Sequence, residues 1–516
     1  MNILLLSMPD AFEHMSPVTI RMPNGALGSL AGNLDTGHRV AIADLILARD
    51  DVRGTVERLL QSVAPDVVGL SVMTFQRRTA HALIRFIRAR RPRTRIVVGG
   101  YDPSLAPEAY SDPSLGADAI VQGEGEVTFR EIVRALAAGT ACTGIAGAIT
   151  RHGATLVEAP RRPVRRLDGE TLGLPDRGAR VLGGYTLLGR PVDVVETSRG
   201  CTYDCSFCSI VEMRGRNFHR FPIDRVLADI EDARARGARS IFFVDDNITL
   251  DMPRFEALCR AIVTSGLNNV DYVVQGMTSA FARHGRTIGP LMRRAGFRYV
   301  FLGIENVLDG DLAFLRASAK NRIRLQGQAA SATLAAVDHV RGNGMYVVGG
   351  LIVGNPDDTP ESIEANLRFA RRHIDWPYIQ HPTPYPGTPM TRDFEARGLV
   401  VNRRAEEYDG TTAVVRTATL DADEIELLRW RAERWMKLAH LPAALAHSPL
   451  FVLRHGWRML RETFHGSSLR SCLGLEDGRA VFERHRRLRR AERADIWRAL
   501  EEARPVAYRS SASSPV

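Results

Sequence analysis

Two successive blocks of short apolar segments, alternating with segments of helical character, restrict this chain to the α/β class. In the first block, continuous apolar runs occupy residues 2–7, 40–44, 67–71, 96–99 and 119–121. Buried parallel strands have this pattern because helices cover both of their faces. Residues 1–145 are therefore predicted to form an open, doubly wound, Rossmann-like sheet, whose ligands bind at the carboxyl ends of the strands.

The second block begins near Val192 and predicts a separate parallel sheet. Its six strand candidates are residues 192–196, 240–244, 272–275, 299–303, 346–353 and 378–381. Six strands with intervening helices suit a full or partial TIM-like barrel over residues 191–400. Residues 146–190, rich in Gly, Pro and Arg, are predicted to be a linker, and residues 401–516 a mostly helical domain.

Composition excludes several classes of protein. The chain has 516 residues, of which 45% are hydrophobic and 25% charged, as in multidomain globular proteins and unlike disordered or collagenous chains. No apolar run reaches the ~20 residues of a transmembrane helix, and the first residues lack the features of a signal peptide. We therefore expect a cytoplasmic protein.

The formal charge of +10 is weak evidence for a nucleic-acid partner. Only Lys320 and Lys437 are lysines, and GC-rich codon usage produces such an arginine skew. Residues 451–516 carry 14 Arg against 8 Asp and Glu, so the excess lies mainly in the C-terminal tail and not along a groove. We expect a small-molecule substrate.

Three of the six cysteines form the most informative cluster in the sequence. Cys201, Cys205 and Cys208 lie within eight residues, directly after a strand candidate and Gly200. Three thiolates in one loop can bind three irons of a 4Fe–4S cubane and leave the fourth iron open for inner-sphere chemistry. The alternatives are a structural zinc site, for which His219 is a candidate fourth ligand, and a chance grouping.

The cysteine spacing, with Phe207 before the last cysteine, resembles the signature of the radical S-adenosylmethionine (SAM) enzymes. The resemblance implies a 4Fe–4S cluster on Cys201, Cys205 and Cys208, with SAM chelating the open iron. It also implies an electron donor such as flavodoxin or ferredoxin, whose electron cleaves SAM into methionine and a 5′-deoxyadenosyl radical.

Two later strand ends carry acidic residues in the order expected of that family. The resemblance assigns Asp245 or Asp246 to the methionyl amine of SAM, whereas the alternative is that these residues simply begin the next helix. Asp251, followed by Pro253, is predicted to cap that helix. Glu305 matches the carboxylate that binds the ribose hydroxyls, and a structural ion pair is its alternative role.

Gly350 and Gly354 match the family's strand that supports the adenine, although Asp357 stands where the family has Glu. Thr359 is predicted to cap the helix that follows. Residues 385–390 resemble a Pro-Gly-Thr-Pro turn of the same families, whose chemistry is not readable from the sequence.

The first block resembles the cobalamin-binding domain that precedes the radical module in a large subgroup, which includes the anaerobic magnesium-protoporphyrin monomethyl ester cyclases and the class B methyltransferases. Ser71 matches the serine near the lower-ligand pocket, and Gly99 and Gly100 match the paired glycines. The Asp-x-His-x-x-Gly segment is missing, and neither His14 nor His38 has its context, so the resemblance implies histidine-off cobalamin. An empty, structural domain is the alternative.

Two features of the C-terminal region have two interpretations each. The apolar side chains of residues 423–439, such as Trp430, Trp435 and Met436, belong to a core or to a lid over an apolar substrate. The basic run of residues 484–490 is a solvated helix face or a docking surface for an acidic reductase or an anionic membrane.

Together these features predict a cobalamin-dependent radical SAM enzyme that methylates an unactivated carbon of a small molecule or natural-product intermediate. In this scheme methylcobalamin donates the methyl group and a second SAM restores it. An oxidative cyclisation or rearrangement with the same cofactors is the alternative, and a non-catalytic metal- or RNA-binding protein is the alternative from another class. No catalytic residue beyond the cofactor ligands is assigned.

Overall fold

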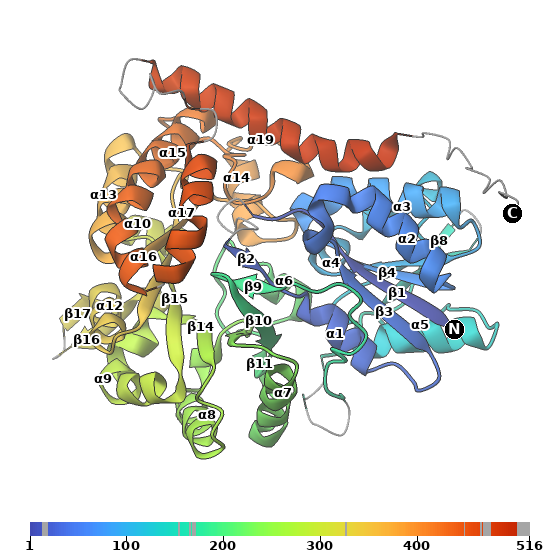
Figure 1. Cartoon of the computed structure of the whole chain (residues 1–516). Coiled ribbons are helices and arrows are strands. Elements are labelled where there is room, and N and C mark those ends of the chain that lie inside the picture. Colours follow the sequence, from blue (N-terminus) through green and yellow to red (C-terminus); the bar gives the residue numbers. More distant parts are fainter. Residues whose placement is uncertain are drawn as a thin grey trace, which may run out of the picture.

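The computed structural model describes residues 1–12, 19–152, 155–164, 167, 172–325, 328–447, 449–464, 467 and 476–502. Within them the chain folds into two sheets flanked by helices, with a group of C-terminal helices beside them (Figure 1). The predicted α/β class is confirmed. The domain boundaries at 145, 190 and 400 stay predictions.

The first sheet has the order β3-β1-β4-β5-β6-β7-β8. Its five parallel strands are β1 (Asn2–Ser7), β3 (Arg39–Asp44), β4 (Val67–Ser71), β5 (Arg95–Gly99) and β6 (Ala119–Val121), and the antiparallel pair β7 (Ala148–His152) and β8 (Thr155–Glu158) extends the edge. The order reverses between β1 and β4, and ligands of such sheets bind at this switch point.

Helices on both faces explain why the strands are apolar without alternation. Leu4 and Leu6 of β1 pack with α2 (Val52–Val63) and α3 (Arg77–Arg90), while Ile3 and Leu5 pack with α1 (Gly25–Gly32) and α5 (Glu126–Ala137). Since every side chain of β1 from Ile3 to Leu6 is fully buried, the doubly wound prediction is confirmed.

The second sheet has the order β19-β18-β15-β14-β13-β10-β9-β2. Its six parallel strands follow one another in sequence and form a partial barrel: β10 (Arg190–Val195), β13 (Ser240–Phe243), β14 (Asp271–Met277), β15 (Phe297–Glu305), β18 (Tyr346–Ile352) and β19 (Trp376–Gln380). Two short antiparallel strands, β9 (Thr186–Leu187) and β2 (Ile20–Arg21), extend the β10 edge. β9 lies in the predicted linker and β2 in the first block, and neither was predicted.

The crossover helices of the barrel are α7 (Ile223–Ala235), α8 (Met252–Thr264), α9 (Thr278–Ala295), α12 (Ala332–Gly342) and α13 (Pro360–His373). Asp251 accepts a hydrogen bond from the Arg254 amide, and Thr359 accepts one from the Ser362 amide, so both predicted helix caps are confirmed. Short elements complete the barrel region: α6 (Ile210–Arg214), α10 (Asp309–Phe314), α11 (Ser318–Asn321), α14 (Pro389–Ala396), the pair β11 (Ser198–Arg199) and β12 (His219–Arg220), and the pair β16 (Arg322–Leu325) and β17 (Gln328–Ser331). The short helix α4 (Tyr101–Leu105) follows β5 of the first sheet.

The C-terminal helices are α15 (Ala422–Ala439), α16 (Leu441–His447), α17 (Pro449–Thr463) and α19 (Gly478–Glu501). Figure 1 shows α19 crossing from α15 to the first sheet, where Trp497 and Leu500 join the core beneath α3. Trp430 of α15 is buried against Phe482, with ring centroids 5.4 Å apart, and Met436 is also buried. These two side chains are therefore core residues, whereas Trp435 is exposed.

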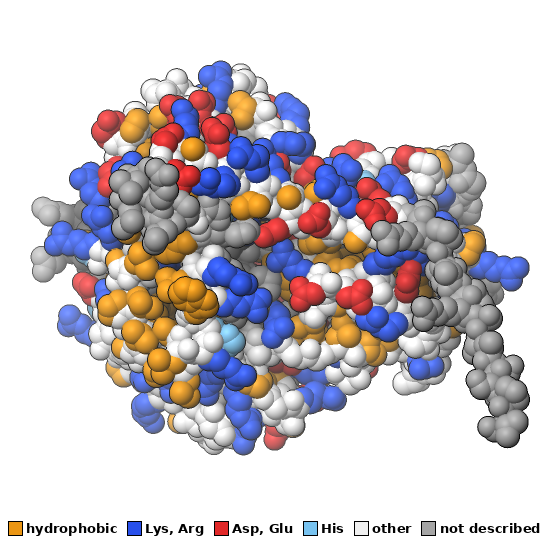
Figure 2. Space-filling model, turned by 45° about the horizontal axis from the view of Figure 1, so that its top comes forward, with side chains coloured by type: hydrophobic (Ala, Val, Ile, Leu, Met, Phe, Trp, Pro, Cys, Tyr) orange, Lys and Arg blue, Asp and Glu red, His pale blue; other side chains and the backbone are white. Residues whose placement is uncertain are grey.

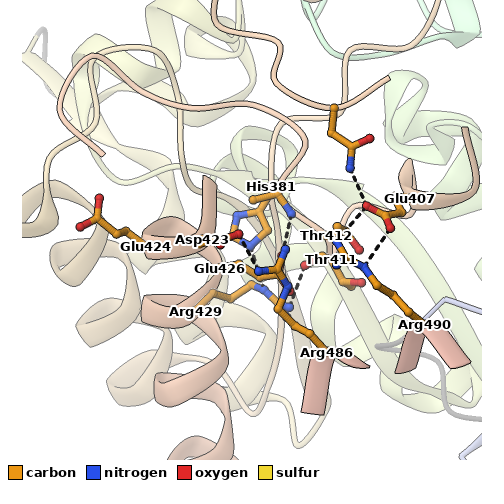
Figure 3. A network of polar contacts seen from close by, with 12 residues as sticks. His381, Glu407, Thr411, Thr412, Asp423, Glu424, Glu426, Arg429, Arg486 and Arg490 are labelled. Atoms are coloured by element: carbon orange, nitrogen blue, oxygen red, sulfur yellow. Dashed lines mark hydrogen bonds and ion pairs between the residues drawn. The ribbon is translucent and has the colours of Figure 1, made fainter. Parts of the chain in front are cut away.

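The basic run of α19 is largely an intramolecular contact rather than a solvated face. Arg486 pairs with Asp423 at 2.5 Å and with Glu426 at 3.5 Å, and Arg490 pairs with Glu407 at 3.0 Å (Figure 3). Because these arginines are one helical turn apart, they lie on the same face of α19, and each meets its own acidic partners there.

Beneath this contact lies Arg429 of α15, which is 1% exposed. Its guanidinium donates to His381 Nε2 at 3.0 Å and to the Thr411 carbonyl at 2.9 Å (Figure 3). It also donates to Glu433 at 2.7 Å. His381 follows β19, so the network connects the barrel's carboxyl edge to the C-terminal helices.

Candidate functional site

The three clustered cysteines lie in the loop that follows β10 and β11. Cys205 is buried, and Cys201 and Cys208 are half-buried. Gly200 has a φ of +88°, and a Cβ there would lie 2.5 Å from the Asn217 carbonyl oxygen, so the loop requires glycine at its start. Asn247 donates a hydrogen bond to Cys201 Sγ at 3.8 Å.

The chemistry of this loop fits an iron–sulfur cluster. Burial raises the pKa of Cys205 to about 11 and that of Cys208 to about 12, so iron must displace protons from these thiols. Within the described residues, no three His, Cys, Asp or Glu side chains converge closely enough to hold a single metal ion. This arrangement suits a cubane cluster, because each thiolate there binds a different iron and the three need not converge on one ion.

The predicted SAM-amine residues lie beside this loop and hold it in place. Asp245 is 1% exposed and accepts hydrogen bonds from the Thr197 amide at 2.7 Å and from the Thr197 and Ser198 hydroxyls at 2.5 Å. Burial raises the pKa of Asp245 to about 7. Asp246 accepts from the Gly200 amide at 2.7 Å. Both carboxylates thus anchor the start of the cysteine loop.

Glu305 ends β15 in a strained conformation. It has a φ of +62°, rare for a residue with a Cβ, and the β15–β18 register shifts between Gly303 and Glu305. Such a bulge re-aims a side chain. Here it brings the carboxylate to Lys320 Nζ at 2.6 Å.

Lys320 is a site residue that the sequence reasoning missed. Its ammonium lies 5.7 Å from the ring centroid of Phe207 and close to the Cys205 thiol. Burial alone lowers the pKa of Lys320, but Glu305 and Cys205 raise it above its ordinary value. A signal was present, because Lys320 is one of only two lysines in an arginine-rich chain.

Gly350 and Gly354 lie in β18 and directly after it, where backbone packs closely. A Cβ on Gly350 would lie 2.8 Å from the Phe301 ring, and Gly354 has a φ of +100°. Asp358 accepts hydrogen bonds from the Gly354 amide at 2.7 Å and the Asn355 amide at 2.9 Å. Asp357, at the position compared with the family's Glu, is exposed and pairs with Arg397.

The turn at residues 385–390 also reaches the cysteine loop. Thr388 caps α14, and the Met390 amide donates to the Ser206 carbonyl at 2.9 Å. The turn therefore supports the backbone between Cys205 and Cys208.

The predicted cobalamin residues lie together at the carboxyl edge of the first sheet. Ser71 and Gly99 are paired in register, and the Ser71 hydroxyl accepts a hydrogen bond from Asn24 Nδ2 at 3.1 Å. Gly100 has a φ of +103°, and a Cβ there would lie 2.8 Å from the Val72 backbone. His38 instead contacts the Met1 amine, close to the amino end of β3, and His14 lies outside the described residues.

Two polar groups at this edge fit a ligand rich in amide donors, as the corrin ring of cobalamin is. The side-chain oxygen Oε1 of Gln122, next to β6, and Oδ2 of Asp10, after β1, are buried, and neither has a hydrogen-bond partner among the described residues. Buried acceptors normally have a donor, so these atoms are available to a bound group.

The carboxyl edge of the first sheet faces the cysteine loop. Arg199, two residues before Cys201, pairs with Glu126 of α5 at 2.6 Å and with Glu196 at 2.8 Å. Ser29 of α1 donates to the same Glu126 at 2.7 Å. The guanidinium of Arg199 thus connects the two sheets at the point where both predicted cofactor sites lie.

A cavity of 1380 Å³ opens elsewhere in the molecule, between the first sheet, the β2–β9 edge and the C-terminal helices. Its wall includes Asp10 and Phe12, Tyr346 of β18, His455 of α17 and Arg489 of α19. Its size exceeds that of ordinary small-molecule sites.

Comparison with known proteins decides the family. Residues 20–133 match the B12 binding domain, and residues 195–370 match the radical SAM superfamily. The chain therefore combines a B12-binding domain with a radical SAM domain. The resemblances drawn from the cysteine spacing and from the glycines of the first block are therefore confirmed.

Its relatives include an uncharacterised methyltransferase of Pyrococcus horikoshii, 27% identical over 84% of this chain and 91% of the relative. The hopanoid C-3 methylase of Methylococcus capsulatus is 26% identical, covering 68% of this chain and 64% of the relative. The anaerobic magnesium-protoporphyrin IX monomethyl ester cyclase of Synechocystis is 27% identical, covering 62% and 64%. The chain thus spans slightly less than two thirds of the last two proteins.

Solved structures share the fold of this B12-binding radical SAM protein. TsrM from Kitasatospora setae, with cobalamin and a 4Fe–4S cluster bound, has a TM-score of 0.64 and 20% identity over 95% of this chain and 99% of that one. OxsB, with aqua-cobalamin and SAM bound, has a TM-score of 0.64 and 15% identity over 98% and 82%. No helix among the described residues is long and apolar enough to cross a membrane.

Proposed function

We propose that this protein is a cobalamin-dependent radical SAM methyltransferase that acts on an unactivated carbon of a small molecule or natural-product intermediate. The observation that carries the proposal is the contact of Arg199 with Glu126, which holds the B12-binding edge against the cysteine loop. A methyl group carried by cobalamin must lie close to the carbon activated by cleaved SAM. The similarity to a methyltransferase over 91% of its length supports the same reaction.

Cys201, Cys205 and Cys208 are the proposed ligands of the 4Fe–4S cluster. When bound, the cluster and cobalamin supply, respectively, the electron that cleaves SAM and the methyl group that is transferred. Asn247 and the anchored Gly200 keep the loop in one conformation before loading. Phe207 and Lys320 close the side of the loop that faces β15.

The SAM site is proposed to involve the ends of three strands. Glu305 accepts hydrogen bonds from the ribose hydroxyls, and the ion pair with Lys320 orients its carboxylate. Gly350 and Gly354 let the adenine approach the backbone. Because every oxygen of Asp245 already serves the cysteine loop, Asp246 is the acid that we assign to the methionyl amine.

The cobalamin site is proposed at Ser71, Gly99 and Gly100, with Gln122 accepting a hydrogen bond from a corrin amide. The position of His38 by the amino end of β3 supports the histidine-off mode. A flavodoxin or ferredoxin in the cytoplasm is the proposed electron donor, because the cluster needs a low-potential electron.

The test is anaerobic reconstitution of the full chain. About four irons and four sulfides per chain are expected. Cys201→Ala should lose most of this iron, whereas Cys142→Ala, a half-buried cysteine outside the loop, should retain it. Retained iron in Cys201→Ala contradicts the ligand assignment.

The reaction type is read from the products of SAM. Formation of 5′-deoxyadenosine and S-adenosylhomocysteine together, with hydroxocobalamin bound, supports methylation. Deoxyadenosine without S-adenosylhomocysteine supports the cyclase or rearrangement chemistry suggested by the similarity to the Synechocystis enzyme.

A further inference from the structure

The segment from Arg434 to Arg461 contains no acidic residue, although the chain has 59 Asp and Glu in 516 residues. The same segment carries five basic residues: Arg434, Lys437, Arg454, Arg458 and Arg461. It covers the end of α15, all of α16 and most of α17. The segment itself therefore carries charge of one sign, and the nearest carboxylates, such as Asp51 and Glu492, come from other elements that line the same cavity.

The most exposed large apolar side chains of the described residues lie on this segment. Leu450, Leu453 and Trp457 of α17 are 81%, 78% and 81% exposed. Among the described residues, no other large hydrophobic side chain exceeds 59%. Their spacing of three and four residues puts them on one stripe of the helix. A folded chain gains nothing from such a stripe unless another surface covers it.

Basic side chains flank the stripe on the same helix. Arg454 follows Leu450 by four residues and Arg461 follows Trp457 by four, a spacing that puts each arginine next to the stripe, at its border with the cavity. Both arginines are exposed. Figure 2 shows hydrophobic side chains gathered on the face that carries these helices, with Lys and Arg beside them.

We propose that α16 and α17 dock on the surface of an anionic lipid membrane. Leucine and tryptophan side chains enter the boundary between headgroups and acyl chains, and arginines at their edge bind lipid phosphates. A second copy of this chain is a poorer occupant, since a two-fold axis would bring the same arginines together. The proposal does not depend on the methyltransferase function.

α17 also borders the 1380 Å³ cavity, whose wall includes Val452, Arg454, His455 and Arg461 but none of the three stripe residues. A membrane seated on the outer stripe would therefore lie next to the opening between the C-terminal helices and the first sheet. This placement suits substrates that partition into or near the bilayer.

The test is sedimentation of the full chain with vesicles of phosphatidylcholine, alone or with about 30 mol% phosphatidylglycerol. Binding to the anionic vesicles, at least about tenfold stronger than to neutral ones, is expected. The triple variant Leu450→Ser, Leu453→Ser, Trp457→Ser should lose this binding and keep its thermal midpoint. Arg454→Gln with Arg461→Gln should weaken it several-fold, as should high salt.

The matched control is Leu334→Ser with Val401→Ser, two exposed apolar residues on other elements, which should bind like the unchanged protein. Absence of binding to anionic vesicles, or equal binding by the triple variant, overturns the proposal. A concentration-dependent dimer that the triple variant abolishes, without vesicle binding, would assign the stripe to a second copy. Capture of an acidic protein with no vesicle binding would assign it to a protein partner.

Discussion

Replacing Arg199 with Gln tests the connection between the two cofactor-binding regions. Arg199 is 5% exposed, and its guanidinium forms ion pairs with both Glu126 and Glu196. Burial raises the pKa of Glu126, but Arg199 outweighs that effect and lowers it from 4.5 to about 2. At ~1.36 kcal/mol per pKa unit, the shift corresponds to about 3 kcal/mol of stability.

The sign of the pH dependence follows from this direction. Because the folded-state pKa of Glu126 lies below the unfolded value, the contribution is complete above pH 4.5 and is lost as the pH falls toward 2. In Arg199→Gln the burial of Glu126 is uncompensated, so its pKa rises and the contribution disappears at neutral pH. Removing one partner of a buried ion pair costs about 3–5 kcal/mol.

The assay is urea unfolding, followed by circular dichroism, of the unchanged protein, Arg199→Gln, Glu126→Gln and the double variant. A coupling energy of about 1–3 kcal/mol is expected from the cycle. Arg199→Gln should also weaken hydroxocobalamin binding, because the B12-binding edge loses its contact with the cysteine loop. A coupling below about 0.5 kcal/mol, within the additivity of independent sites, would refute the reasoning.

Two further variants test the cysteine loop and the SAM site. Gly200→Ala places a Cβ 2.5 Å from the Asn217 carbonyl oxygen at a positive φ, so iron incorporation should fall severalfold. The control Gly237→Ala, also at a positive φ but with open space around the added Cβ, should incorporate iron normally. Equal iron incorporation by both variants contradicts the requirement for glycine at position 200. Lys320→Gln removes the partner of Glu305 at 2.6 Å, and SAM affinity measured by equilibrium dialysis should fall about tenfold with iron content unchanged. Unchanged affinity would exclude Lys320 from the site.

The fold was predictable because its strands are covered on both faces. Every residue from Ile3 to Leu6 is buried, which makes the apolar run visible without knowledge of its neighbours. The two-residue strands β2 and β9 were not predictable, since pairing across the chain, and not local pattern, defines them. The basic run of α19 looked solvated for the same reason, because its partner Glu407 lies 83 residues from Arg490.

The candidate site likewise contains some residues that local sequence reveals and others that only folding brings together. The cysteine ligands follow from local spacing alone, whereas Arg199 and Glu126 are 73 residues apart and meet only through the packing of two sheets. Lys320 reaches Glu305 across 15 residues because a bulge and a positive φ turn the carboxylate toward it. Backbone conformations of this kind have no signature in a single sequence when the residue is not glycine.

Asp357 stands at the position of the family's Glu, but its neighbour Asp358 makes the buried hydrogen bonds of the turn. Asp357 is exposed and pairs with Arg397 on the surface, so Asp357→Ala should change stability by about 0–1 kcal/mol. Asp358 is 1% exposed and accepts hydrogen bonds from the Gly354 and Asn355 amides. Asp358→Ala leaves both amides buried without an acceptor, at about 1–3 kcal/mol each.

The loss at Asp358 should also reach the SAM site, because the turn after β18 would no longer be held at Gly354. Urea midpoints and SAM affinity, measured on both alanine variants, distinguish the two residues. Asp358→Ala should lower both quantities, and Asp357→Ala neither. If Asp357→Ala instead weakens SAM binding with the midpoint unchanged, the exposed acid has the role of the family's Glu, and the assignment of the turn to Asp358 is wrong.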